Sequence, residues 1–453
     1  MRAGARQKNN RTLRAEDSAE VLIHDLDDQG RGVARLGGKV TFIEGALTGE
    51  RVRVRPRKRR RRFDEADLVR IVQASPDRTE PGCAHFSMCG GCRLQHLSAP
   101  AQRRRKVRTL EQTLARHGLP SPGVMLEPLF GEVAGYRRKA RLGVRYVPGK
   151  GGAMVGFREK RSNFVADLVG CEVLVPAVGE RLPPLRALVS SLDARDRIPQ
   201  IEVAAGDSAT ALVFRHLDPL SASDASAIAD FGERFGIQIY LQPGAPDSVV
   251  PLWPETPPPL TYALPEFGLE LAFRPTDFVQ VNAAVNRQLV TRAVELLELR
   301  SSDRVLDLFC GIGNFSLAMA RRAATVTGIE YGADMVDAAE RNADRNGIAN
   351  VSFERRDLDD AETAADWMSR CWDKLLLDPP RSGAASVVGA LRAPYPERVV
   401  YVSCNPESFA RDAAQLVGAH GYRFEKAGIV DMFPHTAHVE VVGLFSRRAT
   451  GLR

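Results

Sequence analysis

The sequence has no long apolar segment and no leader of the kind that exported proteins carry. None of its apolar runs approaches the roughly 20 residues that a helix needs to span a bilayer. The first residues, MRAGARQKNNRTLR, are basic and lack the apolar core of a signal peptide. We therefore expect a cytoplasmic protein without a membrane partner, and no pattern in the chain indicates an obligate protein partner.

Cysteine is scarce, with seven residues in a chain of 453. An odd number of cysteines in a reducing compartment argues against a disulfide scaffold, so these thiols are expected to be ligands, nucleophiles or core residues. The composition, 44% apolar and 26% charged, is typical of a folded globular protein. At this length the chain is expected to form about three domains.

The net charge of +7 is concentrated in two basic clusters. The run RVRVRPRKRRRR, residues 51–62, has nine basic residues and no acidic one. The second cluster consists of Arg103, Arg104, Arg105, Lys106 and Arg108. Clustered cations of this kind indicate a polyanionic partner, and here we expect RNA. A targeting signal or a solvated surface is the alternative interpretation.

The N-terminal half divides into three segments by pattern. Residues 1–15 form a basic tail, and residues 16–75 show short alternating apolar runs broken by glycines, which predicts a small antiparallel β-barrel. Residues 76–265 form a central α+β domain that begins with a cysteine-rich stretch. An amphipathic helix is expected at about 101–118, and this helix is a candidate to pack on the C-terminal domain.

Residues 266–453 are expected to form an α/β domain of the Rossmann-like type. Apolar runs such as RVLDLF, TVTGIE, KLLLDPP and RVVYVSC alternate with alanine-rich helical stretches, the pattern of a doubly wound parallel sheet. In such sheets ligands bind beyond the carboxyl ends of the strands. The loop DLFCGIGNF and Glu330, which ends the second strand, are placed there. A dinucleotide fingerprint would need a third glycine where the chain has Ser316, so the loop fits S-adenosylmethionine better.

Five motifs together resemble the uracil-C5 branch of the class I RNA methyltransferases. They are FVQVN (278–282), DLFCGIGNF (307–315), DPPR (378–381), SCNP (403–406) and MFPHTAHVE (432–440). The N-terminal barrel resembles the OB-like TRAM domain, an RNA-binding module. The resemblance covers nearly the whole chain. It implies that the cofactor is bound by Gln280, Phe309, Asn314, Glu330, Asp357 and Asp378.

The same resemblance implies a catalytic pair, Cys404 and Glu440. Carbon 5 of uracil is too weak a nucleophile to take the methyl group unaided, and a thiolate that adds to carbon 6 activates it. A carboxylate must then remove the proton from carbon 5 so that the thiolate can leave. The alternatives are a buried core thiol for Cys404 and a surface charge for Glu440. His435 and His438 are expected to be structural.

Other reactions fit these motifs less well. Cytosine-C5 methyltransferases also use a thiol but set the cysteine in a different motif. Amino-group methyltransferases need no thiol and stack the base on an aromatic residue, where this chain has Arg381. An RNA-binding or chaperone module with a degenerate catalytic domain is disfavoured, because Cys404, Glu440 and the cofactor loop are all present.

Four cysteines form a candidate metal site: Cys83, Cys89, Cys92 and Cys171. Four thiolates can bind zinc or a four-iron cluster, and spacing alone does not separate the two. The resemblance to the iron–sulfur branch of the family implies a [4Fe–4S] cluster. It also implies 23S rRNA as the substrate, with uracil 1939 as the target. A tRNA methyltransferase that makes 5-methyluridine in the T-loop is the alternative.

Overall fold

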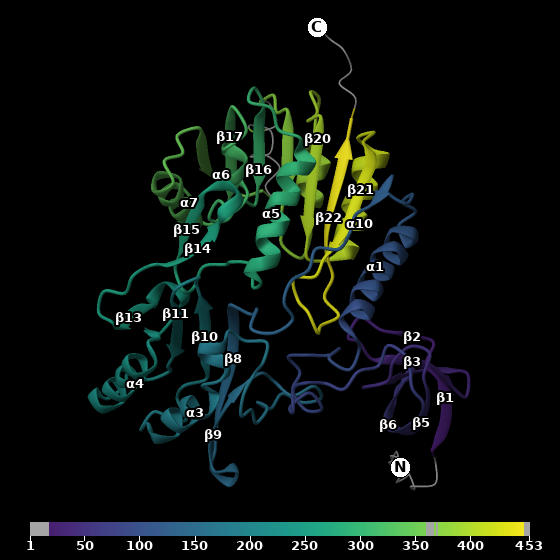
Figure 1. Cartoon of the computed structure of the whole chain (residues 1–453), viewed down its shortest axis with the longest axis vertical. Helices are drawn as coiled ribbons and strands as arrows, with labels where there is room; N and C mark the ends of the chain where they lie inside the picture. Colours follow the sequence, from purple (N-terminus) through teal and green to yellow (C-terminus); the bar gives the residue numbers. More distant parts are fainter. Residues whose placement is uncertain (1–17, 359–366, 368–369, 448–453) are drawn as a thin grey trace, which may run out of the picture. The chain divides into compact units, whose positions relative to one another are not determined.

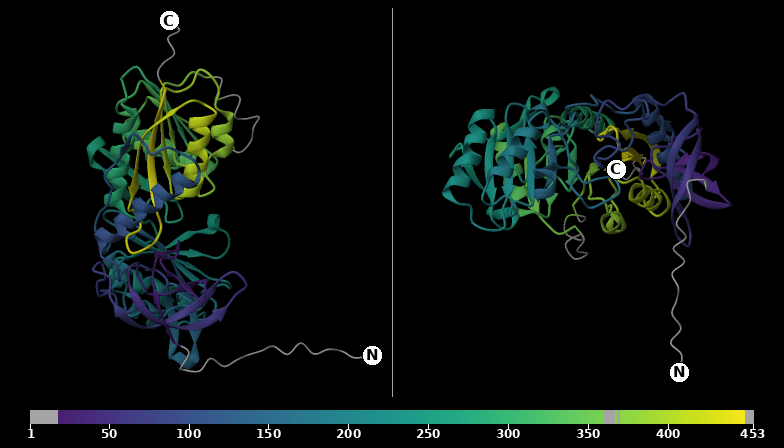
Figure 2. Two further views of the ribbon diagram at one scale, coloured as in Figure 1. Left: turned by 90° about the vertical axis from the view of Figure 1, so that its right-hand side faces the viewer. Right: turned by 90° about the horizontal axis from the view of Figure 1, so that it is seen from below.

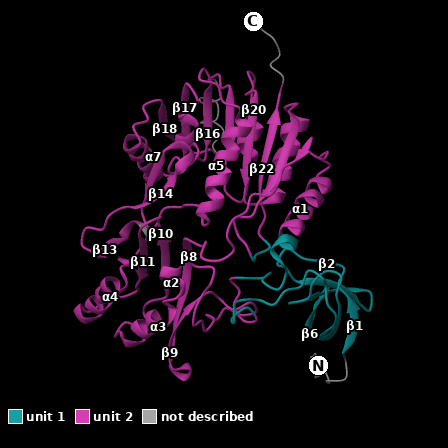
Figure 3. Cartoon of the chain, viewed as in Figure 1, with its two compact units in different colours: residues 1–86, 92–102, 435–437 teal, residues 87–91, 103–434, 438–453 magenta. Residues whose placement is uncertain are grey.

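The computed structural model describes residues 18–358, 367 and 370–447, so the predicted basic tail lies outside the described residues. The chain separates into two compact units (Figure 3). The first unit contains the residues up to Phe86, together with Cys92–Gln102 and His435–Ala437. The second contains Ser87–Gly91, Arg103–Pro434 and the residues from His438 onward. Within the part of the chain that the structure describes, no helix has the length and apolar content of a membrane span.

The first unit is built on a six-stranded sheet in the order β1-β5-β6-β4-β3-β2. The strands are β1 (Ala19–Leu22), β2 (Asp25–Leu26), β3 (Gly32–Leu36), β4 (Lys39–Ile43), β5 (Arg51–Arg59) and β6 (Asp64–Gln73). Strand β1 also contacts β3, so the sheet curls around its small apolar core. In β5 the valines at 52 and 54 are buried, because successive side chains of a strand point to opposite faces. The first basic cluster therefore lies partly on the outer face of this strand.

A second six-stranded sheet forms the central part of the second unit. Its order is β13-β12-β11-β10-β8-β9. The strands are β8 (Lys139–Val147), β9 (Gly152–Gly156), β10 (Gln200–Ala205), β11 (Thr210–Arg215), β12 (Gln238–Gln242) and β13 (Val250–Trp253). The helices of this region are α2 (Pro176–Gly179), α3 (Leu182–Ser191) and α4 (Ala222–Phe235). Helix α4 links β11 to β12, which run parallel. It is capped by Ser221 and ends at Gly236, whose left-handed backbone suits glycine.

The third sheet has eight strands in the order β18-β17-β16-β19-β20-β22-β21-β7. Figure 1 labels five of them, β16, β17, β20, β21 and β22. The strands are β7 (Val124–Met125), β16 (Arg304–Leu308), β17 (Thr325–Glu330), β18 (Val351–Arg355), β19 (Lys374–Leu377), β20 (Arg398–Ser403), β21 (Arg423–Val430) and β22 (Glu440–Ser446). The run from β18 to β20 is parallel, as the sequence predicts. Strand β22 is antiparallel to both of its neighbours, β20 and β21. The Rossmann-like fold is thus confirmed, with an antiparallel strand that the sequence pattern did not predict.

Helices cover both faces of the third sheet (Figure 2). They are α5 (Ala283–Leu297), α6 (Ser316–Ala320), α7 (Ala333–Arg345), α9 (Ala385–Ala390) and α10 (Pro406–Gly418). A hairpin of β14 (Leu260–Leu264) and β15 (Leu269–Phe273) precedes α5 in the chain. The helix predicted at 101–118 is α1 (Ala99–Arg116).

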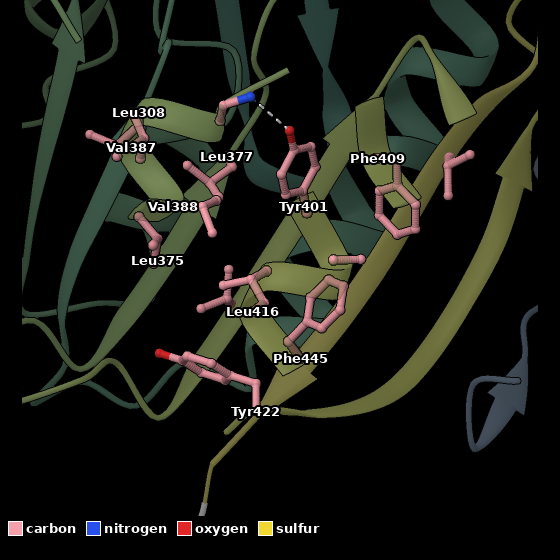
Figure 4. Packing of buried hydrophobic residues seen from close by; sticks show 14 of the residues in the cluster. Leu308, Leu375, Leu377, Val387, Val388, Tyr401, Phe409, Leu416, Tyr422 and Phe445 are labelled. Carbon is pink, nitrogen blue, oxygen red and sulfur yellow. Dashed lines mark hydrogen bonds between the residues drawn. The ribbon is translucent and has the colours of Figure 1, made fainter. Parts of the chain in front are cut away.

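The core of the third sheet is apolar and closely packed (Figure 4). It includes Leu308, Leu375 and Leu377 from the parallel strands and Tyr401 from β20, whose hydroxyl group accepts a hydrogen bond from the backbone N–H of Ala384 at 3.1 Å. Leu110 and Leu114 of α1 belong to the same core. The apolar face of α1 therefore packs on the C-terminal sheet of the second unit, and each buried leucine is expected to stabilise this packing by about 1.5–3 kcal/mol.

Candidate active site

A cavity of about 710 Å³ lies at the carboxyl edge of the third sheet. This volume is within the range of about 300–1,000 Å³ that is usual for small-molecule sites. The eight residues predicted to act in cofactor binding or catalysis all line it: Gln280, Phe309, Asn314, Glu330, Asp357, Asp378, Cys404 and Glu440. The structure thus brings together residues that are up to 160 positions apart in the sequence.

The position of these residues follows from the sheet topology. Phe309, Asp378 and Cys404 each come directly after a parallel strand, and the carboxyl ends of parallel strands meet at one edge. Glu440 is the first residue of β22. Because β22 runs antiparallel, its beginning lies at this same edge. The antiparallel strand is therefore what brings a carboxyl group from the C-terminal end of the chain into the cavity.

The glycine-rich loop after β16 adopts an unusual backbone. Phe309, Gly311 and Gly313 have φ angles of 66°, 55° and 90°. A left-handed conformation is easy for glycine but costs about 1–2 kcal/mol for Phe309. The backbone N–H of Phe309 donates to the carbonyl of Ile329 at 2.9 Å, which holds the loop against β17. Such strain is typical of binding sites.

Glu330 is fixed by backbone amides. One carboxylate oxygen accepts hydrogen bonds from the N–H groups of Tyr331 (2.8 Å) and Gly332 (3.2 Å). The other accepts from the N–H of Gly311 at 3.1 Å and so ties β17 to the glycine loop. Three amide donors hold the carboxylate in one orientation at the cavity wall, where its remaining lone pairs can accept hydrogen bonds from a ligand.

Asn314 is held by two residues that the sequence interpretation did not identify. Its side-chain amide exchanges reciprocal hydrogen bonds, both 3.0 Å long, with the side chain of Asn286 on α5. The hydroxyl group of Tyr262, on β14, donates to the same Asn314 oxygen at 2.9 Å. Tyr262 also lines the cavity. No local motif marks it, because it lies 52 positions before Asn314 in a separate hairpin.

Acidic residues dominate the charged groups that line the cavity. It is lined by four carboxyl side chains, Glu330, Asp357, Asp378 and Glu440, and by the guanidinium of Arg381. Burial raises the pKa of Asp378 to about 7. It also raises the pKa of Glu440 to about 8, with a further contribution from the charge of Asp378. A cationic ligand would relieve this crowding of acids, whereas the pyrophosphate of a dinucleotide would be repelled.

Cys404 and Glu440 come from neighbouring strands in matching register. Ser403 of β20 pairs with Val441 of β22, so the next step of the antiparallel register sets Cys404 opposite Glu440. Burial raises the pKa of the Cys404 thiol, and the negative charges of Glu440 and Asp378 raise it further. Arg381 opposes them and favours the thiolate. A half-buried free thiol beside a buried carboxyl group is thus present in the cavity.

A second thiol, Cys310, lines the same cavity. It is only 3% exposed, and burial together with the charges of Asp307 and Glu330 raises its pKa well above the usual value. Because the thiolate is the nucleophilic form, Cys310 is less suited to attack a ligand than Cys404 is.

Two family models and several related proteins match the sequence. Residues 18–69 match the TRAM domain, and residues 268–448 match the family described as tRNA (Uracil-5-)-methyltransferase. The chain is 50% identical over 432 residues to the 23S rRNA (uracil(1939)-C(5))-methyltransferase RlmD of Xanthomonas axonopodis pv. citri. The matched region covers 95% of this chain and 97% of that protein. It is 49% identical over 428 residues to the protein of the same name from Thiobacillus denitrificans, covering 94% and 99%. The chain belongs to the RlmD family of RNA uracil-C5 methyltransferases.

A solved structure of a related enzyme has the same overall fold. The tRNA (uracil-54, C5)-methyltransferase of Pyrococcus abyssi, in complex with S-adenosyl-L-homocysteine, superposes with a TM-score of 0.72 and covers 94% of this chain and all of that one. Its sequence is 24% identical, so the likeness concerns the fold.

Among the described residues, none of the four cysteines of the candidate cluster forms a disulfide. Cys83 and Cys92 belong to the first unit, and Cys89 and Cys171 belong to the second. The backbone N–H of Gly91 points to the sulfur of Cys89 at 3.4 Å. Among the residues that the structure describes, no group of three or more His, Cys, Asp or Glu side chains is arranged to hold a metal ion. The [4Fe–4S] cluster therefore stays a prediction.

One member of the second basic cluster does not fit the predicted role. Lys106 is only 1% exposed, whereas Arg104 and Arg108 are exposed. Its ammonium group donates to the carboxylate of Asp431 at 2.6 Å and to the carbonyl of Phe433 at 3.0 Å. The prediction that Lys106 contacts RNA phosphate is therefore wrong, because the amphipathic helix turns this residue into the protein interior.

Proposed function

We propose that this protein transfers a methyl group from S-adenosylmethionine to carbon 5 of a uracil in RNA, and that the substrate is uracil 1939 of 23S rRNA in the cytoplasm. The observation that carries the proposal is the Cys404–Glu440 pair, which shares one cavity with the cofactor loop. The target follows from relatives of about 50% identity that bear this activity in their name.

The cavity suits a cationic nucleoside cofactor. Glu330, which three backbone amides hold in one orientation, would accept hydrogen bonds from ribose hydroxyls. Gln280, Phe309, Asn314, Asp357 and Asp378 would hold the rest of the molecule, and the acidic lining favours its positive charges. When bound, the cofactor supplies an electrophilic methyl group on a sulfonium sulfur.

Cys404 would act first, as the nucleophile. Its thiol loses a proton to solvent, which the charge of Arg381 favours, and the sulfur of the thiolate then forms a bond to carbon 6 of the uracil. The electron pair of the carbon 5–carbon 6 double bond moves onto carbon 5 and carbon 4 oxygen as an enolate. Carbon 5 can then take the methyl group, which leaves a saturated ring that is covalently bound to Cys404.

Glu440 would act second, as the general base. Its carboxylate removes the remaining proton from carbon 5, the double bond forms again, and the carbon 6–sulfur bond breaks to release the thiolate. With a pKa of about 8 in the ligand-free site, Glu440 is poised to hold and release a proton near neutral pH. The proton that it accepts then passes to solvent.

RNA binding is proposed for the first unit. In the basic run, residues 57–62 are all exposed and lie on or directly after β5. Arg57 is engaged with Glu65 and Asp67 of β6, which neutralises part of the charge. A [4Fe–4S] cluster on Cys83, Cys89, Cys92 and Cys171 is proposed as a structural element, and no catalytic step depends on it.

Mapping of 5-methyluridine tests the proposed function. In a strain that lacks the gene, mass spectrometry of nuclease digests should show loss of the methyl group at uracil 1939 of 23S rRNA. The natural gene should restore it, and a Cys404→Ala gene should not. Loss of 5-methyluridine from the tRNA T-loop, with uracil 1939 still methylated, would overturn the assignment in favour of the tRNA substrate.

A further inference from the structure

Lys106 forms a buried ion pair with Asp431, and its charge acts on the proposed base, Glu440. It lies on α1, more than 300 positions before Glu440 in the sequence. Its ammonium group bonds Asp431 and the carbonyl of Phe433. Both residues belong to the connection 431–439, which leaves β21 and delivers Glu440 to the start of β22. Hydrogen bonds from Lys106 therefore hold the first part of this connection against α1.

Stability alone does not explain a pair of this kind. Lys106 is 1% exposed and Asp431 is 3% exposed, so both charges lose most of their hydration. Well-packed apolar residues in place of such a pair are often equally stable or more stable. The better-supported role of a buried ion pair is to hold the chain in one conformation. Here the Lys106–Asp431 pair would fix the path of the segment that precedes Glu440.

The charges around Glu440 come from several elements. Asp378, after β19, and Asp431, after β21, raise its pKa, and Cys404, after β20, is a third group that would be negative when ionised. Lys106, from α1, lowers the pKa of Glu440 and so opposes the two acids. Burial already raises the pKa of Glu440, and without Lys106 that pKa would be higher still.

We propose that Lys106 is a positioning residue for the elimination step: through Asp431 and Phe433 it holds the segment that leads to Glu440, and its positive charge favours the carboxylate that must accept the carbon 5 proton. The inference rests on the proposed role of Glu440. It predicts that loss of Lys106 slows release of the methylated RNA from Cys404 more than it slows methyl transfer.

The test is a single-turnover reaction with methyl-labelled cofactor and a 23S rRNA fragment that contains uracil 1939. Samples are quenched in denaturant between pH 6 and 9, and labelled RNA is separated into protein-bound and free fractions. In Lys106→Met the bound, methylated fraction should accumulate, with elimination about 10- to 100-fold slower. The acidic limb of the elimination rate should move up by about one pH unit, because Glu440 loses a neighbouring cation.

Two further variants serve as controls for Lys106→Met. Arg116→Met removes an exposed cation from the same helix and should behave as the natural enzyme. The double variant Lys106→Met with Asp431→Leu leaves no unpaired buried charge and should fold, yet it should still trap the adduct because the tie to Phe433 is lost. In the double variant the pH limb should stay near its natural position, since two opposing charges are removed together.

Glu440→Gln separates this inference from the proposed function. If Glu440→Gln traps the adduct while Lys106→Met and the double variant release product at the natural rate with an unmoved pH limb, Lys106 has no positioning role. If Glu440→Gln itself traps nothing, the assignment of the base is wrong. Accumulation of the adduct in Glu440→Gln, in Lys106→Met and in the double variant supports the proposal.

Discussion

Replacing Glu440 with glutamine should stabilise the protein against unfolding, and the gain should grow with pH. Glu440 is 6% exposed, and burial raises its pKa from 4.5 to about 8. Between these two values the folded protein binds more protons than the unfolded chain does, so its free energy of unfolding falls as pH rises. Glutamine imitates the protonated acid at every pH and avoids this loss.

The size of the effect follows from the two pKa values. Their difference corresponds to on the order of 5 kcal/mol once the pH exceeds 8, and to about 2 kcal/mol at pH 6. Below about pH 4.5 the natural protein and the variant should unfold alike. A proposed catalytic acid–base group thus costs stability at neutral pH, a known trade-off at functional sites.

Urea unfolding of the apo protein, followed by tryptophan fluorescence across this pH range, measures the effect. All three tryptophans, Trp253, Trp367 and Trp372, lie in the second unit together with Glu440. Glu425→Gln is the matched control. Hydrogen bonds from Ser446 and Arg423 lower the pKa of Glu425, so its replacement should destabilise the protein above pH 4.5. Parallel pH curves for Glu440→Gln and the natural protein would refute the reasoning.

Three other predictions concern the RNA surface, the cluster and the cofactor site. Replacing the arginines at 59–62 with alanine should reduce the slope of log affinity for RNA against log salt concentration by up to about 3. An unchanged slope would show that these arginines do not contact RNA phosphates. Anaerobically purified protein should be brown with about four irons per chain, and Cys171→Ser should lower the iron content, whereas stoichiometric zinc without iron would contradict the cluster. Asn286→Leu removes the reciprocal hydrogen bonds of Asn314 and should weaken binding of S-adenosylhomocysteine about tenfold in calorimetry. Unchanged affinity would show that Asn314 needs no such support.

The sequence predicted the parallel sheet and eight of the residues that line the cavity, because local patterns mark them. The motifs around Phe309, Asp378 and Cys404 follow apolar strands directly, and sheet topology then brings strand ends together. The predicted helix and its apolar face were also local features, and Leu110 and Leu114 are in the core.

Other features depend on long-range packing that local patterns do not carry. Strand β7 has two residues and adds to the edge of the sheet by pairing with β21, which no periodicity in so short a segment could indicate. Tyr262 reaches the cavity from a separate hairpin. Lys106 was grouped with its arginine neighbours by sequence, although the turn of the helix buries it against Asp431.

The central claim, covalent catalysis by Cys404, is tested most directly with RNA that carries 5-fluorouridine at position 1939. Fluorine cannot leave carbon 5 as a proton does, so the methylated adduct should persist and survive denaturing electrophoresis. Peptide mapping by mass spectrometry should then locate the RNA on Cys404. Cys404→Ala should form no adduct, and Cys310→Ser, a change of the other thiol in the cavity, should still form it. An adduct in Cys404→Ala, or attachment to Cys310, would contradict the account.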